Sequence, residues 1–302
     1  MNGVLIIDKP AGSTSHDVVN RVRRILQQPS VGHLGTLDPL ATGVLPLVTG
    51  NLTRLAQFYG ASEKTYEGVI RFGFATDTYD SDGGVQGLVQ AVNVSLEQIR
   101  ALASQFAGLI EQMPPPFSAK KIKGVPAYKL ARKQQEVALK PVQVEIKEFE
   151  ILGVQGDQVS FRARVASGTY MRSIAHDMGR QLGCGAHLQS LRRTVLGEFD
   201  LSQAHTLEEL DRVCNAGTID EVFIPPRRLL PAFPCVTASE EAAALIRNGR
   251  AVNLPELSQA RQVKVFAGQR ELIAIATRIA GTLFHPRIVL AAEPVRQLAS
   301  RK

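Results

Sequence analysis

A single aspartate set between glycines and directly before a proline is the feature that most constrains this chain. Residues 32–45 read GHLGTLDPLATGVL, with Asp38 followed by Pro39 and flanked by Gly35 and Gly43. Glycine permits backbone conformations closed to other residues, while proline fixes its own φ and disfavours the helical region for the residue before it. We therefore expect a shaped loop that presents the Asp38 carboxylate. From these residues alone, an ordinary Asp-Pro turn is the alternative.

The charge of the chain is uneven. Its 302 residues are 44% hydrophobic, enough for a buried core, and carry a formal net charge of +7. Most of that charge lies in residues 115–140, where seven Lys and Arg residues stand against one Glu. A polyanionic partner such as nucleic acid would explain this concentration, and a solvated charged loop is the alternative.

Cysteine usage and the N-terminal residues indicate a reducing compartment. The cysteines Cys184, Cys214 and Cys235 form no CxxC pair and lack the histidine spacing of a zinc site, so free thiols are expected. The chain shows no basic stretch followed by a long apolar run near Met1, and no apolar window approaches the length of a membrane span. The expected location is the cytoplasm.

Hydrophobic patterns predict a mixture of helices and strands rather than a regular βα alternation. Helices are expected over residues 16–27, capped by Thr14 or Ser15, over residues 95–106 with a stop at the prolines 114–116, and over residues 169–183. Strands are expected at residues 4–7, 66–74, 142–151 and 159–165. Prolines at 225–234 indicate a boundary, after which strands at 262–266, 271–277 and 283–290 predict a small β-rich module.

Six short blocks, in order along the chain, resemble the motifs of the TruB family, the bacterial tRNA pseudouridine-55 synthases. The first four are IDKPAGSTS at 7–15, GHLGTLDPLATGVLPL at 32–47, KTYEG at 64–68 with TDTYD at 76–80, and PPFSAKK at 115–121. The last two are GTYMRS at 168–173, and GCGAH at 183–187 with LRR at 191–193. Leu34 and Thr36 depart from the family's usual loop residues, but neither change removes a catalytic group.

The resemblance implies an α+β fold: a mixed, largely antiparallel sheet of the pseudouridine synthase fold with flanking helices, plus a small C-terminal β pseudobarrel like a PUA domain. It implies a catalytic domain over residues 1–228 and a PUA-like RNA-binding domain over residues 229–302. Residues 115–140 correspond to the family's thumb, an insertion that closes on the tRNA T stem-loop.

The resemblance also assigns the chemistry, the isomerisation of uridine to pseudouridine, to Asp38, Tyr66 and Arg172. Asp38 corresponds to the catalytic aspartate, and Arg172 to the arginine that pairs with it, which would favour the ionised carboxylate. Tyr66 corresponds to the tyrosine that stacks on the target base and is a candidate proton acceptor. Bottom-up, Arg172 in a helix's first turn could equally be a solvated arginine, and Tyr66 an ordinary core aromatic. Whether Asp38 attacks C1′ or C6, or a glycal forms by elimination, stays open.

Further residues are carried over from the family as contacts to RNA. His33, Tyr66, Tyr170 and Leu191 match positions at the substrate pocket, although a lone histidine is more often structural, and Lys9 and Pro10 match scaffold positions. The expected RNA-binding residues of the thumb are Lys120, Lys121, Lys123, Tyr128 and Arg132.

The resemblance implies no metal and no cofactor, and a monomer that acts on tRNA without guide RNA or membrane. Two other classes of function stay open from the sequence: a nonenzymatic RNA-binding or RNA-folding protein on the same fold, and an aspartate-dependent hydrolase of a small molecule. Formation of pseudouridine in an unmodified tRNA transcript distinguishes the synthase from both.

Overall fold

The computed structural model describes residues 1–118, 120–122, 124–127, 139–254 and 259–290. These residues form a ten-stranded sheet, a five-stranded sheet and two short hairpins. The strands of the large sheet are β1 Gly3–Lys9, β2 Val31–His33, β3 Thr42–Thr49, β4 Lys64–Phe72, β7 Gly108–Gln112, β10 Val142–Gln155, β11 Gln158–Val165, β12 Ala186–Leu196, β13 Phe199–Asp200 and β14 Ala204–His205. The hairpins are β5 Ala75–Thr76 with β6 Val85–Gln86, and β8 Lys121–Ile122 with β9 Val125–Pro126.

The large sheet runs in the order β14-β1-β3-β12-β4-β11-β10-β7, with β13 beside β12 and β2 beside β3. Only the pairs β1–β14 and β3–β12 among its described strands are parallel. The mixed, largely antiparallel sheet predicted from the sequence is therefore confirmed. Strand β12 lies at the centre and joins β3, which follows the Asp38 loop, to β4, which carries Tyr66.

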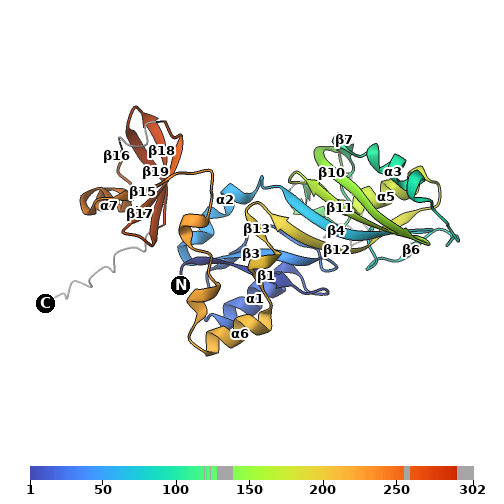
Figure 1. Cartoon of the computed structure of the whole chain (residues 1–302), viewed down its shortest axis with the longest axis horizontal. Coiled ribbons are helices and arrows are strands. Elements are labelled where there is room, and N and C mark those ends of the chain that lie inside the picture. Colours follow the sequence, from blue (N-terminus) through green and yellow to red (C-terminus); the bar gives the residue numbers. More distant parts are fainter. Residues whose placement is uncertain (119, 123, 128–138, 255–258, 291–302) are drawn as a thin grey trace.

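Helices cover the two ends of this sheet. The described helices are α1 Ser15–Ile25, α2 Ala56–Tyr59, α3 Leu96–Ser104, α5 Met171–Gln181, α6 Leu207–Asn215 and α7 Glu240–Arg247, with short 3₁₀ turns η1 Gly50–Leu55, η2 Leu201–Gln203, η3 Ile219–Val222 and η4 Pro226–Arg228. In Figure 1, α1 and α6 lie at the end near β1, whereas α3 and α5 lie at the end near β10 and β7. Thr14 caps α1 in a full capping box with Asp17, which confirms one of the two expected caps.

Both faces of β1 are buried, which explains its continuous apolar sequence. Leu5 and Ile7 pack with the apolar side of α1, while Val4 and Ile6 pack on the opposite face with Leu55 of η1. The large sheet thus has an apolar core on each of its faces.

The five-stranded sheet forms a second, smaller module, shown apart at the left of Figure 1. Its strands, in spatial order, are β15 Cys235–Ala238, β17 Gln262–Ala267, β18 Glu271–Ala280, β19 Leu283–Val289 and β16 Val252–Asn253. The three C-terminal strands expected from the sequence are confirmed. Phe266, Ile275 and Ile288 join the same apolar cluster as Leu55 and Leu229, so this module packs against the part of the chain that carries the large sheet.

The expected extent of the helix that begins after Ser95 is wrong. Ser95 does cap α3, but the helix ends at Ser104, and the edge strand β7 follows before the prolines. Gly108, at φ +89°, adopts a left-handed conformation that suits glycine and starts this strand. The sequence signal was weak because β7 is an edge strand with an exposed Leu109.

Two further observations concern the chain as a whole. Within the described ranges, no helix combines the length and apolar character needed to cross a membrane. Cys184, Cys214 and Cys235 are free, as expected.

Candidate active site

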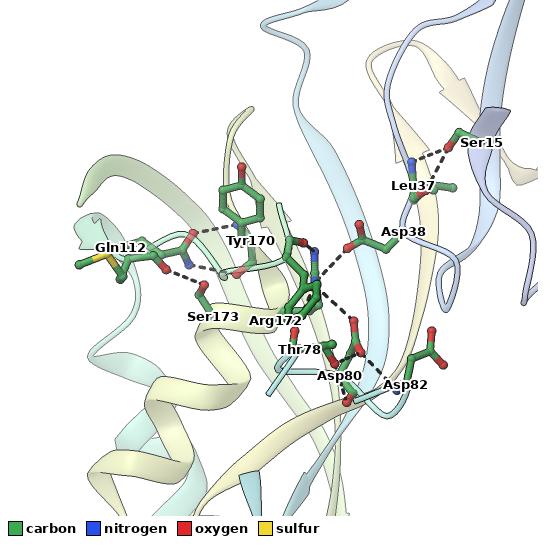
Figure 2. A network of polar contacts seen from close by, with 12 residues as sticks. Ser15, Leu37, Asp38, Thr78, Asp80, Asp82, Gln112, Tyr170, Arg172 and Ser173 are labelled. Carbon is green, nitrogen blue, oxygen red and sulfur yellow. Dashed lines mark hydrogen bonds and ion pairs between the residues drawn. The ribbon is translucent and has the colours of Figure 1, made fainter. Parts of the chain in front are cut away.

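The Asp38 loop connects β2 to β3 and is held on both sides of the aspartate. The Ser15 hydroxyl accepts a hydrogen bond from the Leu37 N–H at 2.8 Å and donates to the Leu37 carbonyl at 3.0 Å (Figure 2). On the other side, Lys9 Nζ donates to the Pro39 carbonyl at 3.2 Å. These bonds fix the backbone while leaving 41% of the Asp38 side chain exposed, so the loop presents its carboxylate to solvent.

A fully buried arginine on β12 supports the start of the same loop. The Arg193 guanidinium donates to the carbonyls of Gly35 at 2.9 Å, Thr36 at 3.3 Å and Val44 at 2.8 Å. Gly43 lies in register with Arg193 at φ +96°, and a Cβ there would come within 2.2 Å of the Arg193 carbonyl oxygen. Glycine is therefore required where β3 leaves the loop.

Arg172, near the start of α5, links two carboxylates. Its Nε lies 2.9 Å from Asp38 Oδ2, and its Nη1 lies 3.4 Å from Asp80 Oδ2 (Figure 2). The Nε–H makes no hydrogen bond, so its contact with Asp38 is an ion pair. Nη1 and Nη2 donate to the carbonyls of Thr78 and Phe117 at 3.1 and 3.0 Å. The arginine is fixed from three sides, and the contact expected between Arg172 and Asp38 is present.

Asp80 is the buried member of this network. Its carboxylate accepts hydrogen bonds from the Thr78 hydroxyl at 2.5 Å and the Asp82 N–H at 3.2 Å. Burial raises the pKa of Asp80, while Thr78 and the Arg172 guanidinium oppose that shift. Asp80 therefore depends on both Thr78 and Arg172 for its stabilisation as an anion.

Asp38 opens into a cavity of about 320 Å³. Tyr66, Tyr170, Arg172 and Leu191 line it together with Asp38, so the cavity unites five of the residues assigned from the sequence. The remaining lining residues are Leu34, Gly35, Thr36, Leu37, Ala41, Gly60, Lys64, Ser118, Ser167, Gly168, Thr169 and Met171.

Tyr66 forms part of the cavity wall from β4. It stands in register with Arg193 of β12, and its side chain is almost fully buried beside that guanidinium. Burial raises the pKa of Tyr66, and Arg193 partly counteracts this. The phenol is therefore protonated at neutral pH in the free protein, with its ring available at the cavity.

Tyr170 precedes α5 and is fixed by its backbone. The Gln112 side chain accepts from the Tyr170 N–H at 2.8 Å and donates to the Tyr170 carbonyl at 3.0 Å (Figure 2). The Ser173 hydroxyl donates to the Met113 carbonyl at 2.7 Å, tying α5 to the end of β7. These contacts hold both Tyr170 and Arg172 in place.

Three residues assigned from the sequence do not line this cavity. His33 lies at the end of β2, and its buried Nδ1 has no hydrogen-bond partner; burial lowers its pKa. Lys9 and Pro10 line a separate cavity of about 300 Å³ near Arg192. Burial lowers the pKa of Lys9 to about 8, although Asp38 favours its charged form. Lys9 supports the Asp38 loop from behind, as a scaffold residue would.

The expected RNA-binding residues are described only in part. Lys120 is half-buried and donates to the Lys140 carbonyl at 3.4 Å. Lys121 belongs to β8. Lys123, Tyr128 and Arg132 lie outside the described residues.

Sequence reasoning missed three residues of the site. Asp80 and Lys64 stand in quoted motifs but received no role, and Arg193 was noted only as part of a motif. Asp80 and Arg193 are buried ionisable groups, which a sequence pattern does not reveal because their partners come from distant elements. Lys64 did give a signal, since it stands two residues before Tyr66 on a strand and so shares its face.

Comparison with solved structures identifies the fold. A chain in "Crystal structure of the archaeal box H/ACA sRNP Nop10-Cbf5 complex" superposes with a TM-score of 0.70 at 25% identity, over 96% of this chain and 86% of that chain. A chain in "Structure of H/ACA RNP bound to a substrate RNA containing 2'-deoxyuridine" gives a TM-score of 0.71 at 24% identity, over 96% and 85%.

Family models define the class. Residues 23–171 match the model "TruB family pseudouridylate synthase (N terminal domain)", and residues 172–231 match "tRNA pseudouridylate synthase B C-terminal domain". The fold and these matches therefore place the chain in the pseudouridylate synthase class. Two curated relatives, each called tRNA pseudouridine synthase B, come from Solibacter usitatus (49% identical, covering 96% of this chain and 100% of the relative) and Stutzerimonas stutzeri (39%, covering 97% of each). The chain belongs to the TruB family.

Proposed function

We propose that this protein isomerises a uridine of tRNA to pseudouridine, at position 55 of the T loop. The observation that carries the proposal is the half-exposed Asp38 carboxylate at the wall of the cavity, held by the buried Arg172. Membership of the TruB family and two relatives called tRNA pseudouridine synthase B support it.

The reaction breaks the N1–C1′ bond of uridine, rotates the uracil and joins C5 to C1′. The proton lost from C5 is balanced by the one gained at N1, so no redox step is needed. A carboxylate suits this chemistry as a nucleophile or as a stabiliser of positive charge on the ribose. Attack at C1′, attack at C6 and elimination to a glycal all place Asp38 beside the nucleotide.

The uracil must leave the RNA stack to reach Asp38, at a cost of a few kcal/mol. Tyr66 and Leu191 line the cavity with an aromatic ring and an apolar side chain, which suit a flipped base. Because burial favours the protonated phenol, Tyr66 would stack on the base and could accept the C5 proton only after losing its own. Tyr170 and Arg172 also line the cavity.

The rest of the chain is proposed to bind the T stem-loop without a guide RNA. The cation-rich residues 115–140 act as a thumb against phosphates, and the catalytic domain, residues 1–228, is followed by an RNA-binding domain, residues 229–302. We further propose that the protein acts as a monomer in the cytoplasm, with His33 filling space left by the flipped base.

Incubating the purified protein with an unmodified tRNA transcript, then quantifying pseudouridine after nuclease digestion, tests the function. The wild type should convert the target uridine, and Asp38→Asn should bind the same RNA without converting it, because the shape of the side chain is kept while its charge is lost. Asp220→Asn, an exposed change in η3, is the matched control and should remain active.

Two outcomes would contradict the proposal. A wild type that binds tRNA but leaves its uridines unchanged would indicate a nonenzymatic RNA-binding protein. Single-turnover conversion by Asp38→Asn at the wild-type rate would remove Asp38 from the reaction.

A further inference from the structure

Lys64 occupies the cavity wall beside Tyr66 without a role in the chemistry above. The two residues stand two apart on β4, so their side chains project from the same face, with origins about 7 Å apart. Both line the cavity that contains Asp38. A group that binds at Lys64 therefore lies one nucleotide unit or less from a base at Tyr66.

Among the residues that the structure describes, the Lys64 ammonium has no anionic partner. Its Nζ donates to the Ser62 carbonyl at 2.7 Å, which uses one of its three N–H bonds. No carboxylate of the described residues lies within ion-pair distance of it, and the neighbouring Glu63 pairs instead with Lys147 and Arg164. Two donors of Lys64 are thus available to a ligand.

Lys64 is the charged residue of the cavity lining that has no carboxylate at ion-pair distance among the described residues. The other two charged lining residues, Asp38 and Arg172, pair with each other, and Arg172 also contacts Asp80. Burial and the Arg193 guanidinium lower the pKa of Lys64 to about 8. An anion bound at Lys64 would compensate its charge locally.

The wall next to Lys64 leaves room for such an anion. Gly60, Ser167 and Gly168 line this part of the cavity, and a Cβ added at Gly60 or Gly168 would meet no atom within 4 Å. The Ser167 hydroxyl donates to the Gly60 carbonyl at 2.6 Å, which ties the two small-residue segments together. The space is open to backbone-sized groups.

We propose that Lys64 binds a phosphodiester adjoining the target uridine and thereby sets the position of its ribose over Asp38. The proposal rests on the function proposed above. Lys64 is a positioning residue: it holds the nucleotide by its backbone, while Asp38 and Tyr66 address the sugar and base. An ammonium suits this task as a point charge that tolerates small shifts of the phosphate.

The test removes the charge from each side of the contact in turn. T stem-loops carry a single neutral methylphosphonate linkage either 5′ or 3′ of the target uridine, with a 2′-O-methyl group on the preceding sugar. The control RNA has the same 2′-O-methyl group and an ordinary phosphodiester. Affinity is measured with the inactive Asp38→Asn protein, alone and combined with Lys64→Met or Lys64→Arg. Arg100→Met on α3, an exposed cation outside the cavity, is the matched control.

With Lys64 present, one of the two neutral linkages should weaken binding by roughly 10- to 100-fold, the range for a charge-assisted hydrogen bond. Lys64→Met should weaken binding of the control RNA by a similar factor. In that variant the neutral linkage should cause almost no further loss of affinity. Lys64→Arg should retain most of the affinity. Arg100→Met should keep the full response to the neutral linkage.

Two results would overturn the inference. One is an equal loss from the neutral linkage with and without the Lys64 charge. The other is no loss at either linkage in the protein that retains Lys64, a result that needs no Lys64 variant to fold. Failure of the proposed function is recognised separately, as absence of pseudouridine from wild-type protein and all-phosphodiester RNA.

Discussion

Arg172 Nε lies 2.9 Å from Asp38 Oδ2, although Arg172 is buried and Asp38 is half exposed. The same guanidinium reaches Asp80, so a single arginine joins a carboxylate that faces the cavity to one that is buried. The orientation of Asp38 therefore depends on contacts made behind it.

Replacing this arginine should damage both catalysis and folding. Arg172→Met leaves Asp38 without its ion-pair partner and Asp80 as an uncompensated buried charge, which typically costs about 3 kcal/mol or more. We expect the single-turnover rate to fall by roughly 100-fold and the unfolding free energy to drop measurably. Arg180→Met, on the exposed side of α5, is the control. A wild-type rate for Arg172→Met between pH 6 and pH 8 would show that the contact has no part in catalysis.

Removing the charge of Asp80 should affect the rate more than RNA binding, because Asp80 does not line the cavity. Asp80→Asn keeps the side-chain shape but frees Arg172 from one anchor, and we expect a rate reduction of about tenfold, or about 1.4 kcal/mol. Single-turnover rates and binding constants measured on the same RNA separate the two effects.

A pH profile gives Asp80 a second test. Burial raises the pKa of Asp80, so its protonation should lower the wild-type rate at a higher pH than an ordinary aspartate would. This loss of rate at low pH should be absent from Asp80→Asn. It should be present in Asp82→Asn, because that change leaves the backbone hydrogen bond from Asp82 to Asp80 in place. Identical profiles for all three proteins would exclude Asp80 from the network.

The family resemblance predicted the contact between Asp38 and Arg172, which lie more than a hundred residues apart in the sequence. It did not predict the buried residues Asp80 and Arg193, which support these two side chains. Strand β12 was missed, since Arg193 at its centre is buried and two register shifts against β4 interrupt any alternation. His33 was assigned to the substrate pocket from the family resemblance, whereas His33, at the end of β2, is not among the residues that line the cavity.

The strand predictions found β1 and β11 but missed β3. The alternation of Val159, Phe161 and Ala163 marked β11 because those side chains share one buried face. In β3, Val44 and Leu45 face opposite apolar clusters, so no alternation exists to detect. The buried partners of charged residues follow only from the three-dimensional pairing of strands.

Lys9 should make stability depend on pH in an unusual direction. Its pKa is lowered to about 8 in the folded protein from 10.5, so between those values the unfolded chain binds more protons than the folded one. The free energy of unfolding should therefore rise with pH from about 8 to 10, by up to about 1.4 kcal/mol per pH unit from this group. Denaturant unfolding at each pH measures the slope.

Two variants test whether Lys9 causes the rise of unfolding free energy with pH. Lys9→Met should remove Lys9's share of the rise and also lower stability at pH 9, because the Pro10 and Pro39 carbonyls lose their donor. Lys140→Met removes an exposed lysine and should leave the slope unchanged. An undiminished slope in Lys9→Met would mean that this lysine keeps an ordinary pKa in the fold.

The charge concentrated in residues 115–140 should govern the salt dependence of tRNA binding rather than the chemistry. Replacing Lys120, Lys121 and Lys123 with Gln removes up to three phosphate contacts, each worth somewhat under one unit in the slope of log K against log salt, so the slope should fall by roughly two units. Binding should weaken most at low salt. A matched triple variant, Arg21, Arg24 and Arg100 to Gln, removes the same charge from exposed sites on α1 and α3.

Single-turnover rates at saturating protein separate binding from catalysis in these variants. The Lys120, Lys121 and Lys123 variant should approach the wild-type rate once the RNA is fully bound, because contacts to phosphates position the RNA and the family resemblance assigns none of the three lysines to the reaction. The control triple should change neither the rate nor, by more than a fraction of a unit, the salt slope. If the slope of log K against log salt falls equally in the two triple variants, the fall reflects the lower net charge of the protein. The tRNA would then not bind preferentially along residues 115–140.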